Sequence, residues 1–261
     1  MDRTIACGDV HGCLDELREL LDLLRLSPQD HLVFVGDLVD RGPKPVETVR
    51  FIRDLVSDRL PGKTTVLCGN HEQKCAKWRL REAQRRETGR ENKMRAPSPE
   101  RQAQWEGLTD DEVDWLRNLP LTVPLTDNWL GVHAGLIPGI PLENQDSDKI
   151  TRLRTLYPDT MKSGQLTDEQ SPLEDPPGTV FWTTLWKGPW SVVYGHAVHS
   201  LEMPRIDRGH NADGDMIACA GIDTGCCFGG RLTAATLHRN GGVEFTQVQA
   251  KRQYAEFGKT R

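Results

Sequence analysis

Three short apolar segments occur in the first seventy residues, and each is followed by a motif of glycines and polar residues. The segments cover residues 4–7, 31–35 and 64–68, short enough to be buried strands rather than helices. Apolar residues recur at helical spacing in the two intervals, at positions 14–24 and 46–56. This alternation predicts consecutive βαβ units, whose parallel strands deliver the motifs that follow them to one edge of a sheet.

Later segments extend this α/β pattern. Residues 121–125 and 129–132 predict a hairpin, and residues 190–194 predict another buried strand. We expect a basic helical insertion around residues 74–107 and a long polar, proline-rich loop region around residues 139–178. Because nothing resembles a linker between two units, we expect residues 1–261 to form a single domain.

The composition is typical of a soluble protein made inside the cell. The net charge is −5, and the chain contains neither a run of eighteen apolar residues nor a signal peptide. Its seven cysteines lack the paired CxxC spacing of a zinc site, so we interpret them as buried thiols of a reducing compartment. We expect a cytoplasmic location. The first strand begins almost at Met1, which leaves open a targeting segment upstream of it.

Potential metal ligands follow five of the predicted strands. A single histidine in such a place is more often a hydrogen-bonded core residue, but five strand ends are unlikely to match by chance. Carboxylate, imidazole and amide groups without a thiolate suit Mn²⁺, Fe or Zn²⁺ in a dinuclear site. The residues are Asp9 and His11, Asp37, Asn70 and His71, His133, and His196.

Asp37 is the natural bridge in such a site, because a carboxylate between two cations about 4 Å apart offsets their repulsion. Asp9 and His11 would complete one metal site. Asn70, His133 and His196 would complete the other. We expect two divalent cations, with Mn²⁺ preferred and Fe, Zn²⁺ or Co²⁺ as alternatives.

The same motifs carry a family resemblance that spans nearly the whole chain. The chain resembles the calcineurin-like metallophosphoesterases of the phosphoprotein-phosphatase type, whose signature is GDxHG, GDxVDRG, GNHE, HAG and GH. The resemblance implies a four-layer α-β-β-α fold, a β-sandwich of mixed sheets flanked by helices. The matching segments are Gly8–Gly12, Gly36–Gly42, Gly69–Glu72, His133–Gly135 and Gly195–His196.

The resemblance also implies roles for three further residues. His71 would protonate the leaving oxygen, and Asp40 would orient His71. Arg41 would grip the phosphate through a bidentate contact that a lysine could not reproduce.

Three segments are similar to the symmetrical, ApaH-like diadenosine tetraphosphatases, and the last of the three resembles the eukaryotic branch of that group. They are Ile222–Thr233, Thr151–Arg154 and Leu185–Trp190. The similarity implies hydrolysis of phosphoanhydride bonds in dinucleoside polyphosphates such as diadenosine tetraphosphate. Arg154, and next Arg152, are then the candidates for holding the phosphates beyond the reacting one.

Charge supports a polyanionic substrate without identifying it. Residues 74–101 contain ten Lys and Arg against four Glu, which favours dinucleoside polyphosphates, capped RNA or inorganic polyphosphate near the site. Asp40 keeps a serine/threonine phosphoprotein phosphatase as the main alternative, followed by an mRNA cap hydrolase or an endopolyphosphatase. A non-catalytic scaffold is disfavoured because every expected ligand is present. We expect neither membrane association nor an obligate protein partner.

Overall fold

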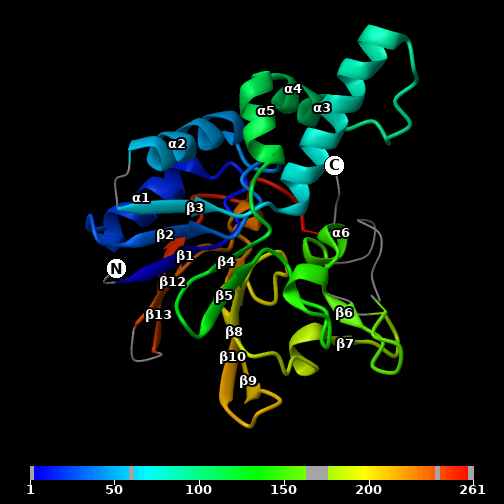
Figure 1. Ribbon diagram of the computed structural model, residues 1–261. Coiled ribbons are helices and arrows are strands. Elements are labelled where there is room, and N and C mark those ends of the chain that lie inside the picture. The colour runs from blue at the N-terminus through cyan, green and yellow to red at the C-terminus, as the bar shows by residue number, and fades with distance from the viewer. Residues whose placement is uncertain (1–2, 59–61, 163–175, 239–241, 258–261) are drawn as a thin grey trace.

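A computed structural model of the protein describes residues 3–58, 62–162, 176–238 and 242–257 (Figure 1). Its first sheet contains the predicted parallel strands in the order β1-β2-β3, and β12 pairs antiparallel with β1 on the other side. β12 also pairs with β11 and β13. The strands are β1 Thr4–Cys7, β2 His31–Phe34, β3 Lys63–Val66, β11 Asp223–Thr224, β12 Arg231–Leu237 and β13 Val243–Gln249.

The second sheet has the order β4-β5-β8-β10-β9. β8 lies parallel to both β5 and β10, so the carboxyl ends of β5 and β8 point the same way. A separate two-stranded sheet pairs β6 with β7. The strands are β4 Thr122–Pro124, β5 Trp129–Val132, β6 Thr155–Leu156, β7 Val180–Phe181, β8 Ser191–Tyr194, β9 Arg205–His210 and β10 Met216–Gly221.

Helices cover the outer face of the first sheet and extend beyond the edge where its parallel strands end (Figure 1). The α-helices are α1 Leu14–Leu24, α2 Pro45–Asp58, α3 Asn70–Thr88, α4 Pro99–Glu106, α5 Asp110–Arg117 and α6 Ser147–Ile150. Short 3-10 helices are η1 Leu142–Asn144, η2 Trp182–Thr184 and η3 Cys226–Phe228. A capping box begins α5, since Thr109 Oγ1 accepts the N–H of Glu112 at 3.2 Å.

Alternating side chains of the strands define the layers. In β2, Leu32 and Phe34 pack against the helices, whereas Val33 faces the second sheet. In β8, Val193 meets that inter-sheet core, and Val192 and Tyr194 pack on the opposite face against η2 and its neighbours. Helices, two mixed sheets and a further outer layer therefore reproduce the expected α/β sandwich.

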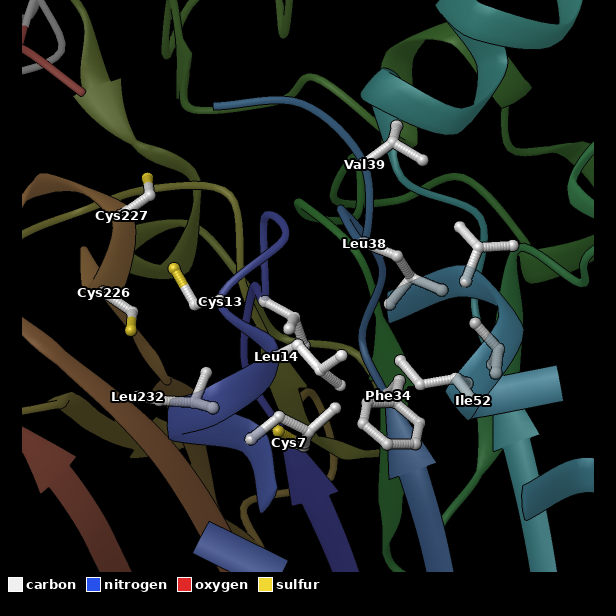
Figure 2. Packing of buried hydrophobic residues seen from close by; sticks show 14 of the residues in the cluster. Cys7, Cys13, Leu14, Phe34, Leu38, Val39, Ile52, Cys226, Cys227 and Leu232 are labelled. Atoms are coloured by element: carbon white, nitrogen blue, oxygen red, sulfur yellow. The ribbon is translucent and has the colours of Figure 1, made fainter. Parts of the chain in front are cut away.

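The seven cysteines are buried free thiols, as the sequence predicts. Figure 2 shows Cys7, Cys13, Cys226 and Cys227 among the apolar side chains beneath α1. Most of the tryptophans are core residues too, with Trp105 and Trp182 fully buried. Part of the long loop region expected around residues 139–178, namely residues 163–175, lies outside the described residues.

Candidate metal centre and active site

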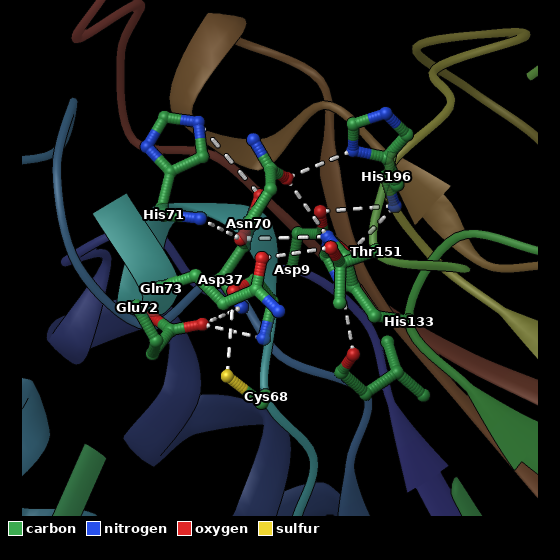
Figure 3. Close-up of polar contacts among 12 residues, drawn as sticks. Asp9, Asp37, Cys68, Asn70, His71, Glu72, Gln73, His133, Thr151 and His196 are labelled. Carbon is green, nitrogen blue, oxygen red and sulfur yellow. Dashed lines mark hydrogen bonds and ion pairs between the residues drawn. The ribbon is translucent and has the colours of Figure 1, made fainter. Parts of the chain in front are cut away.

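The predicted ligands converge where the strands of both sheets end (Figure 3). Asp9 and His11 follow β1, and Asp37 follows β2. Asn70 and His71 begin α3, directly after the turn that follows β3. The second sheet supplies the remaining two, since His133 follows β5 and His196 follows β8. All seven lie within one continuous site because parallel strands share the direction in which their carboxyl ends point.

Asp37 lies at the centre of this site, with one carboxylate oxygen toward each side. Its Oδ2 lies 3.4 Å from Nε2 of His11 and 3.9 Å from Nε2 of His71. Its Oδ1 lies 3.4 Å from Nε2 of His133. Asn70 Oδ1 lies 3.1 Å from that same His133 nitrogen and 3.0 Å from Nδ1 of His196.

Two groups of potential metal ligands therefore share Asp37. One is His11, Asp37 and His71, and the other is Asp37, His133 and His196; in each, the ligand atoms lie within 4.8 Å of one another. The first group differs from expectation because it contains His71 rather than Asp9. The carboxylate of Asp9 instead accepts the backbone N–H of His196, at 3.2 and 3.0 Å.

Backbone carbonyls fix the orientation of two of the histidines. His11 Nδ1 lies 2.8 Å from the carbonyl oxygen of Val39, and His133 Nδ1 lies 2.8 Å from that of Val35. An Nδ1–H that donates to a carbonyl leaves the Nε2 lone pair of each ring available to a cation. Both carbonyls belong to the segment around Asp37, so the shared carboxylate and its neighbouring histidines are positioned together.

The site combines buried carboxyl groups with buried imidazoles, whose pKa values are shifted in different directions. Burial opposes ionisation of Asp37, but His133, His71 and His11 outweigh it and hold the pKa of this carboxyl well below its usual value. Burial, with Asp223 and Asp37 as like-charged neighbours, raises the pKa of Asp9 well above its usual value. Burial and the nearby Arg41 lower the pKa of His11, and burial and Arg154 lower that of His196. Clustered carboxyl and imidazole groups form a donor set that suits divalent cations.

Glu72 holds the Asp37 segment onto the start of α3. Its buried carboxylate accepts the backbone N–H groups of Asp37 (2.8 Å), Leu38 (2.8 Å), Val39 (3.2 Å) and Gly69 (2.9 Å). This role was missed from the sequence, although a glutamate three residues after the start of a helix is a known capping signal.

Asp223 is a second missed residue. It is buried in β11, and its Oδ1 accepts the N–H of Gly225 at 2.9 Å. Burial raises the pKa of Asp223, despite this hydrogen bond and the nearby Arg41. An acidic residue after an apolar strand is too common to be noticed in a sequence.

Strained backbone is concentrated in the site. Seven described non-glycine residues have positive φ, and five of them are His11, Asp37, Asp40, Arg41 and His196. Such conformations cost free energy and persist where the surrounding structure imposes them. Space is equally restricted, because a Cβ on Gly195 would lie 2.0 Å from Asp9 Oδ1.

The predicted pair of His71 and Asp40 is formed. His71 Nδ1 donates to Asp40 Oδ2 at 2.5 Å, which leaves Nε2 directed toward Asp37. Burial lowers the pKa of His71, although the carboxylates of Asp37 and Asp40 oppose it. Two side chains of α4 also reach Asp40: Trp105 Nε1 donates to Oδ1 at 2.7 Å, and Arg101 Nε lies 3.3 Å from Oδ2.

Three arginines approach the metal ligands. Arg41 Nη1 lies 2.5 Å from His11 Nε2, and its guanidinium stacks on Phe228, with Cζ 5.0 Å from the ring centroid. Arg152 donates to Gln73 Oε1 at 3.0 Å and to the carbonyl of Asn70 at 3.5 Å. Arg154 donates to the carbonyl of His196 at 3.0 Å. The structure thus brings both Arg152 and Arg154 to the site, whereas the sequence favoured Arg154.

Two groups of ligands that share one carboxylate, next to a guanidinium and an imidazole, suit the hydrolysis of phosphate esters or anhydrides. Together with the layered mixed sheets, this arrangement defines a metal-dependent phosphohydrolase. The chain belongs to the calcineurin-like phosphoesterase family, whose model matches residues 3–245. The predicted family resemblance is therefore confirmed.

Known relatives include proteins named for the hydrolysis of dinucleoside tetraphosphates. The asymmetrical bis(5'-nucleosyl)-tetraphosphatase PrpE of Halalkalibacterium halodurans is 31% identical, covering 94% of this chain and 92% of its own. A symmetrical bis(5'-nucleosyl)-tetraphosphatase of Aromatoleum aromaticum is 38% identical over 51% of this chain and 44% of its own. The crystal structure of a protein provisionally described as a diadenosine tetraphosphatase aligns with a TM-score of 0.67 and 25% identity, covering 94% of this chain and 93% of that one.

None of the helices that the structure describes combines the length and the apolar character needed to cross a bilayer.

Proposed function

We propose that this protein hydrolyses phosphoanhydride bonds of dinucleoside polyphosphates such as diadenosine tetraphosphate. The observation that carries the proposal is the shared carboxylate of Asp37, with Arg152 and Arg154 immediately beside the two groups of ligands. Such an arrangement suits a substrate whose reacting phosphate lies at the cations and whose remaining phosphates need further positive charge. The names of the relatives support the same substrate class.

In this proposal, six side chains hold two divalent cations: Asp9, His11, Asp37, Asn70, His133 and His196. Bound there, the cations would supply Lewis acidity and an activated water at neutral pH. The donors are oxygen and nitrogen without sulfur, so we favour Mn²⁺ over a closed structural zinc. Because the seven thiols are unpaired, a reducing compartment such as the cytoplasm is the favoured location.

The remaining site residues handle the substrate and a proton. Arg41 binds oxygens of the reacting phosphoryl group, and its planar guanidinium fixes their orientation. His71 carries a proton on Nε2 and delivers it to the leaving oxygen, while Asp40 accepts the Nδ1–H and keeps the ring in that orientation. Arg152 and Arg154 bind the next phosphates, which favours the orientation of the phosphate chain that places the reacting phosphate at the cations.

The role of His71 is tested with the His71→Asn variant and aryl phosphates of differing leaving-group pKa. Loss of a positioned general acid costs about 10²–10⁴-fold. We expect a kcat loss of this size on phenyl phosphate and a much smaller loss on 4-nitrophenyl phosphate, whose leaving group needs no proton. Metal binding should persist in the variant. Equal losses on both substrates would contradict the assignment.

The substrate class is tested by comparing kcat/KM on diadenosine tetraphosphate and on a phosphoserine peptide. Asp40 beside His71 also suits a serine/threonine phosphoprotein phosphatase, which remains the alternative. A clear preference for the peptide would overturn the proposal, as would a preference for capped RNA or inorganic polyphosphate. Products distinguish the two kinds of cleavage, because two ADP indicate symmetrical attack and ATP with AMP indicates asymmetrical attack.

A further inference from the structure

The carboxylate of Asp40 is held from three directions. It is fully buried and accepts a hydrogen bond from His71 on Oδ2 and one from Trp105 on Oδ1. Arg101 forms an ion pair with Oδ2 at 3.3 Å, and only 12% of its side chain is exposed. Two of the three donors therefore come from α4, which lies far from Asp40 in the sequence.

We propose that Arg101 and Trp105 of α4 are positioning residues that lock Asp40, and through it His71, for proton delivery to the leaving oxygen. This inference rests on the role of His71 proposed above. It gives a role in the reaction to α4, where the chain returns to the site after the basic segment that follows Asn70. Among the described residues, their hydrogen bond and ion pair in this region go to Asp40, so we expect both to act through it.

The physical reason is rotation of the carboxylate. A single bond from His71 would allow the Asp40 carboxylate to turn about its Cβ–Cγ bond, and the imidazole would follow it. A second donor on the opposite oxygen removes this freedom, and hydrogen bonds to a charged acceptor are stronger than those between neutral groups. The loss of one such bond therefore allows about tenfold or larger effects on a step that depends on its geometry.

α4 itself is well placed to act as a rigid support. Trp105 packs against Trp78 of α3 with ring centroids 5.6 Å apart, and Arg101 lies over the Trp105 ring, its Cζ 5.9 Å from the centroid. Ser98 caps the helix by accepting the N–H of Arg101 at 3.3 Å. Arg79 of α3 also donates to the carbonyl of Trp105. Figure 1 shows α4 between α3 and α5, above the strand ends.

The test uses Trp105→Phe, which removes the indole N–H and keeps an aromatic ring, and Arg101→Met, which keeps the length and removes the charge. The matched control is Trp115→Phe on α5, where a half-buried tryptophan contacts Arg53 instead of the site. We expect each α4 variant to lower kcat about tenfold on phenyl phosphate, with less effect on 4-nitrophenyl phosphate and an unchanged KM. The control should match the unmodified enzyme.

The decisive measurement repeats both substitutions in a His71→Asn background, with thermal melting to confirm that each variant is folded. If α4 acts through His71, its substitutions should cause no further loss of kcat there. Equal losses in both backgrounds, or no loss in the unmodified background, would overturn the inference. The proposed role of His71 fails separately, if His71→Asn alone loses activity equally on both substrates.

Discussion

At the scale of single residues, Asp37 does two things at once. Each of its oxygens faces a different group of histidines, and its backbone has a positive φ that few residues other than glycine adopt. Because Asp37 belongs to both groups, stronger binding within one group alone cannot compensate for its loss. We therefore expect the chemistry of the site to depend on this residue more than on any single histidine.

Asp37→Asn should abolish binding of the second cation, because the neutral amide no longer offsets the repulsion between two cations. Residues that merely support metal ligands cost about 10–100-fold when replaced, so we expect the activity to fall by more than about 100-fold. Calorimetric titration of metal-stripped protein with Mn²⁺ measures the stoichiometry. Asp15→Asn, which changes a carboxylate paired with Lys44 away from the site, is the control. Two cations bound with unmodified affinity would contradict this prediction.

Arg154→Ala should weaken substrate binding and spare the chemistry. Its guanidinium reaches the backbone at His196, just outside the two groups of ligands. We expect KM for diadenosine tetraphosphate to rise about tenfold, the value of one charged hydrogen bond, while kcat changes little. The small substrate 4-nitrophenyl phosphate should be unaffected. Arg208→Ala, which removes an exposed arginine on β9, is the control; a similar loss on both substrates would place Arg154 at the reacting phosphate.

At the scale of elements, the site depends on contacts between segments that meet only in the folded chain. Glu72 in the first turn of α3 gathers four backbone N–H groups, three of them from the segment that follows β2. It therefore joins two strand ends that each carry metal ligands. It adds to the direct link between these segments, in which the backbone N–H of His71 donates to Asp37 Oδ1 at 3.1 Å.

Glu72→Gln should destabilise the protein by about 1–3 kcal/mol, because the amide NH₂ replaces one acceptor and faces backbone donors that remain buried. Urea unfolding of the metal-free protein measures this change. Affinity for Mn²⁺ should fall as well, since the ligands lose their common support. The control Glu19→Gln changes an exposed carboxylate on α1. An unchanged unfolding midpoint would show that the four hydrogen bonds contribute little.

The strand-end ligands could be predicted because each one follows an apolar segment, and the first three of these segments alternate with helices in a regular βαβ order. Because parallel strands end at the same edge of a sheet, Asp9, Asp37 and Asn70 come together irrespective of the conformations of the connecting loops. The support that Trp105 gives to Asp40 could not be predicted in this way. It depends on how far α3 extends and where the chain turns back, and no local pattern encodes that path.

At the scale of the whole molecule, the site lies across the junction of the two sheets. The first sheet contributes Asp9, His11, Asp37 and Asn70, and the second contributes His133 and His196. Beyond this junction, α3 extends past the body of the protein and carries much of the basic segment (Figure 1). Arg90 and Lys93 of this segment are exposed.

Replacing Arg81, Arg90 and Lys93 by Gln should lower kcat/KM for diadenosine tetraphosphate a few-fold at low salt, by weakening attraction of the polyanion. The difference should fade as salt is raised toward 1 M, where the Debye length is about 3 Å. The control replaces the exposed residues Lys187, Arg208 and Arg252 by Gln, which changes the net charge by the same amount outside the basic segment. Equal responses of both variants would mean that only net charge matters.

The pairing of β1 with β12 has a consequence for synthesis on the ribosome. β2 can join one edge of β1 soon after both have left the ribosome, but the partner for the other edge of β1 is Arg231–Leu237, which is made much later. The nascent chain must therefore keep an apolar strand with an open edge until β12 has been translated. Such an edge can pair with other chains. Cellular yield should consequently depend on chaperones that bind the growing chain, and a truncation that removes β12 and β13 should produce insoluble protein.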